Sequence, residues 1–85
     1  VLNITDGSEE YGVLYYTVQV MALHNPIDIS YFRYIADIQV MYNEKDKFYR
    51  YTTGQFRTKD EAGNWRHELI RRGYPNEIFI KKVLR

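Results

Sequence analysis

The 85-residue chain contains no cysteine, and its two prolines and five glycines are few for its length. The lack of cysteine excludes a disulfide framework, a thiolate nucleophile and a cysteine metal site. No apolar run approaches the roughly 20 residues of a membrane-spanning helix, and no basic segment followed by an apolar one opens the sequence. We therefore expect no membrane insertion by these residues, and we expect any export signal or anchor to lie elsewhere in a larger protein.

An excess of charge of one sign is also missing. The chain has 12 basic and 11 acidic residues, and three of the acids (Asp6, Glu9 and Glu10) fall within the first twelve positions. The remaining residues carry 12 basic against 8 acidic groups, which is a mildly basic balance. Nucleic-acid-binding proteins show a dense stripe of lysine and arginine, so nucleic acid is not an expected partner.

Residues arranged for catalysis or metal binding are not evident. His24 and His67 are far apart and neither has a partner at metal-ligand spacing. The carboxylates are mostly flanked by lysine or arginine, and no pattern of a nucleophile, zinc site or phosphate loop occurs. We expect a protein that is not an enzyme and that uses no metal or cofactor.

Aromatic residues are the abundant class, at 16% of the chain, and nine of them are tyrosines. Tyrosine can lie half buried with its hydroxyl in water, so this excess indicates a contact surface as well as a core. A chain of this length forms one domain with one sheet and two helices, and it has no room for a second core.

The hydrophobic pattern divides the chain into an arm and a domain. Residues 1–12 mix acids with glycine and serine without a sustained period, which predicts a linker or flexible arm. The domain is expected over residues 13–85. It opens with the alternating segment YYTVQVMAL, which predicts a strand. Asp28 then stands where it can cap a helix, whose predicted apolar stripe comprises Ile29, Phe32, Ile35 and Ala36.

The second half of the domain predicts two strands, a helix and a last strand. IQVMY and FYRYTTGQF flank a charged turn and read as two strands. A capping box begins at Thr58, and Gly73 occupies the position of a left-handed C-cap, so a helix is expected between them. Its apolar stripe includes Trp65, which we interpret as a core residue and not as a platform for sugars. EIFIKKV predicts the fourth strand.

This order predicts an α+β fold of the βαββαβ type, a split βαβ arrangement like that of ferredoxin and RNP domains. The four strands should form an antiparallel sheet with the first and third strands adjacent, and both helices should cover one face. Alternation places a polar and aromatic strip on the open face, formed by Gln19, Phe48, Arg50 and Thr52, and it also places Met21 there. From pattern alone this strip is either a binding surface or an ordinary solvated face.

Several segments resemble the SPOR family. Its first strand carries an aromatic-x-V-Q-V/I pattern, matched by Tyr16 to Val20, and its third carries an R-V-x-V-G-x-F pattern, matched by Arg50 to Phe56. The following helix of the family contains an E-A step, found here at Glu61-Ala62, and a glycine-aromatic step leads from that helix into the last strand, found here at Gly73-Tyr74. The similarity extends over about residues 13 to 83.

The resemblance implies a non-catalytic module that binds peptidoglycan and targets a larger bacterial protein in the periplasm or cell envelope, as in cell division. Its ligand would be denuded glycan strands, from which the stem peptides have been removed. The resemblance assigns contacts to Gln19, Phe48 and Arg50, with an apolar contact from Ile78 in the last strand, and Thr52 lies on the same strip. A free lactyl carboxylate on muramic acid suits the two-pronged donor of arginine.

Two other functions remain as alternatives. The same open face, with Met21, Tyr15 and Phe48, would suit a protein partner in an envelope complex. RNA-binding RRM domains share the strand order, but KFYRYTTGQF has Arg50 and Thr52 where that family requires stacking rings.

Overall fold

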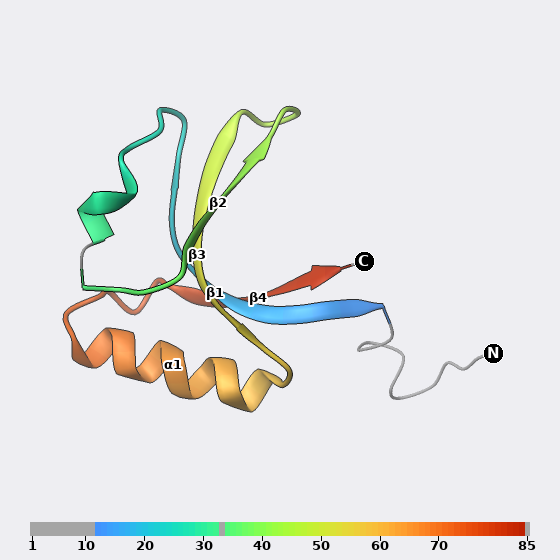
Figure 1. The fold of residues 1–85 in the computed structure, drawn as a ribbon, viewed down its shortest axis with the longest axis vertical. Helices are drawn as coiled ribbons and strands as arrows, with labels where there is room; N and C mark the ends of the chain where they lie inside the picture. Colours follow the sequence, from blue (N-terminus) through green and yellow to red (C-terminus); the bar gives the residue numbers. More distant parts are fainter. Residues whose placement is uncertain (1–11, 33, 85) are drawn as a thin grey trace.

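The computed structural model describes residues 12–32 and 34–84, so the predicted arm lies outside the described residues except for Gly12. The domain is an α+β fold with one sheet and one α-helix (Figure 1). Its elements are β1 (Val13–Leu23), the 3-10 helix η2 (Ile29–Phe32), β2 (Ile38–Asn43), β3 (Phe48–Phe56), α1 (Lys59–Arg71) and β4 (Phe79–Leu84). No helix within the described part of the chain is long and apolar enough to cross a membrane.

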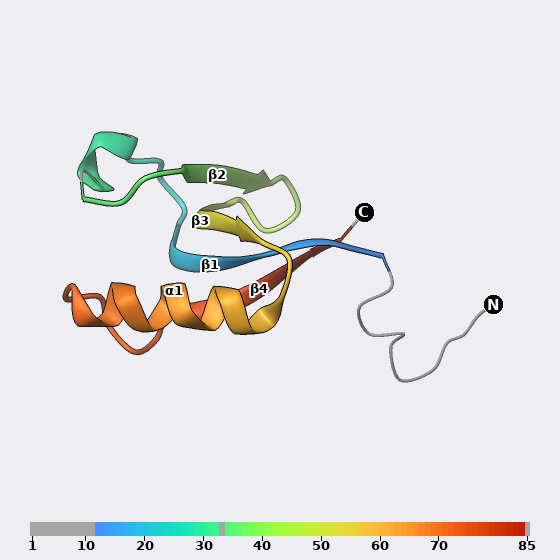
Figure 2. The same ribbon diagram turned by 60° about the horizontal axis from the view of Figure 1, so that its bottom comes forward.

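The sheet has the order β2-β3-β1-β4, and every neighbouring pair is antiparallel. The predicted four-stranded antiparallel sheet, with the first and third strands adjacent, is therefore confirmed. Figure 2 shows α1 lying along one face of the sheet, below β1 and β4. The core lies between this helix and the sheet, where Val18, Tyr51 and Leu69 are fully buried.

The prediction of two helices is wrong, because the described residues between β1 and β2 form the four-residue η2 in place of an α-helix. Asp28 accepts a hydrogen bond from the Ser30 backbone N–H at 2.8 Å, as a capping residue does. The next bond joins Tyr31 N–H to the Asp28 carbonyl, three residues back, which is the 3-10 pattern. The segment is rich in aromatic and β-branched residues, which are weak helix formers, and it ends after one turn.

Two hydroxyl groups of β3 bind the connection between β1 and β2, one on each side of η2. The Tyr51 hydroxyl accepts from Ile27 N–H at 2.8 Å and donates to the Ile27 carbonyl at 3.3 Å. The Thr53 hydroxyl donates to the Ala36 carbonyl at 2.9 Å. Backbone groups outside regular structure need such partners when they are buried, so these two side chains replace bonds that a helix would have made internally.

Helix α1 matches its prediction in detail. The Thr58 hydroxyl accepts from Glu61 N–H at 3.1 Å, and the Glu61 carboxylate accepts from Arg57 N–H at 3.1 Å. At the other end, Gly73 has a φ of 114° and Tyr74 N–H reaches the Leu69 carbonyl, which completes a Schellman motif. The expected apolar stripe faces the core and consists of Ala62, Trp65, Leu69 and Ile70.

An irregularity in β1 changes the face on which its last residues lie. Gln19 pairs with Thr52, whereas Met21 pairs with Tyr51, so β1 has one extra residue at this point. Met21 consequently lies on the covered face, where it packs against the core. The prediction that Met21 shares the helix-free face with Gln19 is therefore wrong.

Replacing Thr53 with valine is expected to destabilise the domain by about 1–3 kcal/mol, because the Ala36 carbonyl loses its donor and Trp65 Nε1–H loses its acceptor. The matched control is Thr52→Val on the same strand. Thr52 is also fully buried, but its hydroxyl has no hydrogen-bond partner among the described residues, so this change should be neutral or stabilising. Urea denaturation measures the free energy of unfolding of both variants. Equal losses would show that the hydrogen bonds of the Thr53 hydroxyl contribute nothing to stability.

Gly54→Ala is expected to cost at least about 1–2 kcal/mol, because Gly54 has a φ of 86°, in the left-handed region. A Cβ there would also clash with the Phe56 ring. Gly63→Ala is the control, since a Cβ at that helical position meets only Ile80 Cδ1, at 3.7 Å. Alanine is the better helix former, so this change should raise the free energy of unfolding by about 0.5–1 kcal/mol. Thermal melts that shift in the same direction for both variants would contradict this assignment.

Candidate binding groove

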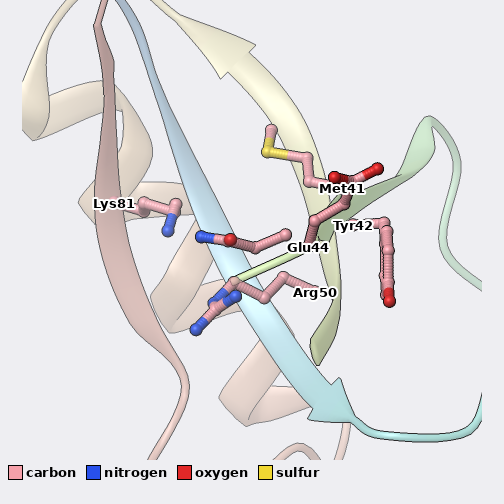
Figure 3. A pocket seen from close by; sticks show the side chains of 6 residues that line it. Met41, Tyr42, Glu44, Arg50 and Lys81 are labelled. Carbon is pink, nitrogen blue, oxygen red and sulfur yellow. The ribbon is translucent and has the colours of Figure 1, made fainter. Parts of the chain in front are cut away.

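The helix-free face of the sheet carries a groove of about 470 Å³. Its lining comes from β2 and the following turn (Met41, Tyr42, Asn43 and Glu44), from β3 (Arg50) and from β4 (Lys81). Strands β2 and β4 form opposite edges of the sheet, so the sheet must curl around this face for both to line one groove. Figure 3 shows Lys81 and Arg50 reaching from different strands toward the same space.

The groove is polar and contains two cationic side chains. Lys81 forms no ion pair among the residues that the structure describes. Arg50 binds Asp46 in the β2–β3 turn through two hydrogen bonds, from its two terminal nitrogens to the two carboxylate oxygens, at 3.2 and 2.6 Å. Hydrogen bonds from the Arg50 guanidinium and from Phe48 N–H lower the pKa of Asp46. The hydrogen bond between Arg50 and Asp46 also raises the pKa of Arg50.

An aromatic stack continues the site beyond Arg50. The Phe48 ring stacks on the His24 imidazole, with ring centroids 3.9 Å apart and planes inclined by 27°. The guanidinium carbon of Arg50 lies 5.4 Å from the centroid of the same Phe48 ring, which is cation–π distance. Phe48 and Arg50, two of the predicted site residues, are therefore adjacent at one end of the helix-free face.

Gln19 and Thr52 are paired in the middle of this face, but they are not exposed. Gln19 is 8% exposed and Thr52 is 0% exposed, and neither Gln19 Oε1 nor Thr52 Oγ1 has a partner among the described residues. The Tyr15 hydroxyl donates to Gln39 Oε1 at 3.3 Å, and because β3 separates β1 from β2, the Tyr15 side chain crosses β3 on this face. Gln19 and Thr52 thus form part of the floor of the sheet and not its outer surface.

Ile78 does not belong to the helix-free face. It is 3% exposed and lies in the hydrophobic core, just before β4 begins. The next residue, Phe79, pairs with Gln19 and is 47% exposed. On the helix-free face this part of the chain therefore presents Phe79, one residue after Ile78.

Sequence reasoning missed Phe79 and Lys81 as members of the site. The signal was present, because alternation along EIFIKKV separates Ile78 and Ile80 from Phe79 and Lys81. The role of β2, by contrast, depends on the curl of the sheet, which no local pattern reveals.

Clusters of side chains that could hold a metal ion are absent from residues 12–32 and 34–84. Comparison with known protein families, curated proteins and solved structures gives no significant match.

Removal of the Arg50 guanidinium by Arg50→Ala is expected to raise the pKa of Asp46 toward its ordinary value of 3.8. In the native protein the pKa is lowered, so the contribution of the pair to stability is complete above about pH 3.8 and is lost as pH falls through the lower folded pKa. Carboxyl-carbon NMR titration measures this value, with Glu68 as an internal reference because its arginine partners are unchanged. An unaltered Asp46 titration would show that the contact is not populated in solution.

Proposed function

We propose that this domain is a non-catalytic module that binds glycan strands of peptidoglycan lacking stem peptides, and that it directs a larger bacterial protein to the cell envelope. Two findings support the proposal: the resemblance of the strand and helix motifs to the SPOR family, and the polar groove on the helix-free face. The observation on which it chiefly rests is the convergence of Arg50 and Lys81 in that groove.

The groove suits the chemistry of a denuded glycan. Each muramic acid without its peptide carries a free carboxylate, and a guanidinium or an ammonium binds a carboxylate through charge-assisted hydrogen bonds. Arg50 and Lys81 come from strands that do not adjoin one another, so they present two positive charges to one ligand. The Asn43 amide offers both a donor and an acceptor to hydroxyl and acetamido groups.

The aromatic residues of the same face supply the apolar part of the proposed contact. Phe79 is half exposed beside Gln19, and Phe48 lies under Arg50. A sugar ring has an apolar face formed by its C–H groups, and burying it against a phenyl ring removes apolar surface from water. We accordingly assign direct contacts with the glycan to Phe48, Arg50, Phe79 and Lys81. Gln19 and Thr52 are buried and are assigned a structural role in the sheet beneath these residues.

The alternative of a protein partner on the same face loses part of its basis. It depended on Met21 together with Tyr15 and Phe48, and Met21 lies on the covered face. Tyr15 is tied to Gln39 by its hydroxyl, and the groove lining is largely polar. These features favour a polar ligand over an apolar protein surface.

The test is cosedimentation with intact sacculi and with sacculi treated with an amidase, which removes the stem peptides. We expect binding to the treated sacculi, and we expect Lys81→Ala to weaken it by about tenfold or more, since hydrogen bonds to charged groups contribute about 1.5–3 kcal/mol. Lys82→Ala is the matched control, because Lys82 is the next residue of β4 and lies on the opposite face.

Equal loss in the Lys81 and Lys82 variants would indicate a general attraction of positive charge and would remove the groove from the assignment. Binding to neither preparation of sacculi by the native domain would contradict the proposed function itself.

A further inference from the structure

We propose that Asp46 is an internal competitor for the ligand carboxylate: it occupies the guanidinium of Arg50 in the free protein and must be displaced when a carboxylate ligand binds. This inference rests on the proposed function for the identity of the natural ligand. Asp46 is thereby a specificity-determining residue, although it does not line the groove.

The contact between Asp46 and Arg50 has the geometry of a bound ligand. Each of the two carboxylate oxygens accepts from one terminal nitrogen of the guanidinium, at 3.2 and 2.6 Å, in the two-pronged arrangement that arginine offers to a free carboxylate. Arg50 lines the groove, whereas Asp46 approaches it from the turn. A muramoyl carboxylate entering the groove would therefore seek the same two N–H groups.

The turn fixes the Asp46 carboxylate in place. Asp46 Oδ1 also accepts from Phe48 N–H at 3.0 Å, and Lys47, with a φ of 64°, closes the turn by donating to the Asn43 carbonyl at 2.7 Å. The Asn43 side chain in turn accepts from Lys45 N–H. Because these bonds position the carboxylate before any ligand arrives, little conformational entropy is lost in holding Arg50, and the competition is effective.

The pair is nonetheless accessible to exchange. The side chains of Arg50 and Asp46 are 24% and 39% exposed, and water screens an exposed ion pair so that it contributes little to stability. A ligand carboxylate can replace Asp46 like for like, whereas an uncharged amide would exchange a charged acceptor for a neutral one and lose the stronger bond. The competition thus discriminates against glycans whose muramic acid is still amide-linked to a peptide, at the expense of affinity.

Asp46→Asn tests the inference, because the amide oxygen can still accept from Phe48 N–H while the negative charge on Arg50 is removed. The probes are N-acetylmuramic acid, which carries the carboxylate, and N-acetylglucosamine, which does not. Binding is followed by NMR at the Arg50 Nε–H signal. We expect Asp46→Asn to raise the affinity for N-acetylmuramic acid by about two- to fivefold, the size of an exposed ion pair, and to leave N-acetylglucosamine unchanged.

Glu44→Gln is the matched control, since it makes the same change of charge within the groove lining but Glu44 does not bind Arg50. An equal gain in affinity with Glu44→Gln would show a general field effect and would overturn the inference, as would no gain with Asp46→Asn. If Asp46→Asn alone gains affinity while the native domain binds no sacculi, the competition is real and the glycan function is wrong. If sacculi bind but Asp46→Asn gains nothing, the function stands and the competition fails.

Discussion

The fold depends on buried hydroxyl groups of β3. They form hydrogen bonds with backbone groups of the connection between β1 and β2, which no α-helix satisfies. Tyr51 bonds both backbone groups of Ile27, and Thr53 bonds the carbonyl of Ala36, so both ends of the segment around η2 are fixed to one strand. Trp65 of α1 donates to the same Thr53 hydroxyl. The Thr53 side chain therefore joins α1, β3 and the connection around η2. A buried polar residue in the core thus links the helix to the sheet.

The hydrogen bonds of β3 on the covered face also determine which of its side chains lie on the helix-free face. Alternation places Arg50 and Thr52 on the helix-free side wherever Tyr51 and Thr53 point into the core. The irregular pairing in β1 then moves Met21 out of that side, and the curl of the sheet brings Lys81 toward the hairpin that carries Arg50. The site is thus a consequence of how the core is tethered, although none of its exposed side chains takes part in the tether.

The comparison with the sequence separates local signals from tertiary ones. Helix α1 was predictable because its caps are local hydrogen bonds, written in Thr58, Glu61 and Gly73. The segment around η2 was not, because Phe32 and Ile35 reach the core from an irregular chain as well as from a helix, and the deciding bonds come from distant Tyr51 and Thr53. Of the predicted site, Phe48 and Arg50 are brought together, Gln19 and Thr52 are buried, and Ile78 lies in the hydrophobic core.

The burial of Ile78 and the burial of Gln19 have different physical origins. A motif carried from a family fixes a position only to within one residue at a strand end, and in a strand one residue is the difference between core and solvent. For Gln19 the face was right, but its exposure depends on the side chains packed around it, which the alternation of a strand does not reveal. A helix-free face is therefore not the same as an open one.

A chain with a net charge of only +1 holds its cationic side chains in two different ways. The arginines of α1 are engaged in the structure: Arg66 donates to backbone carbonyls before β4, while Arg71 and Arg72 share Glu68. In the groove, Lys81 has no such partner among the described residues, and Arg50 has one that sits beside the groove and faces water. The proposed carboxylate ligand would therefore meet one cation that it shares with Asp46 and a second, Lys81, in a groove that also contains the Glu44 carboxylate. Such a balance of charges favours selective and reversible binding over tight attraction to any polyanion.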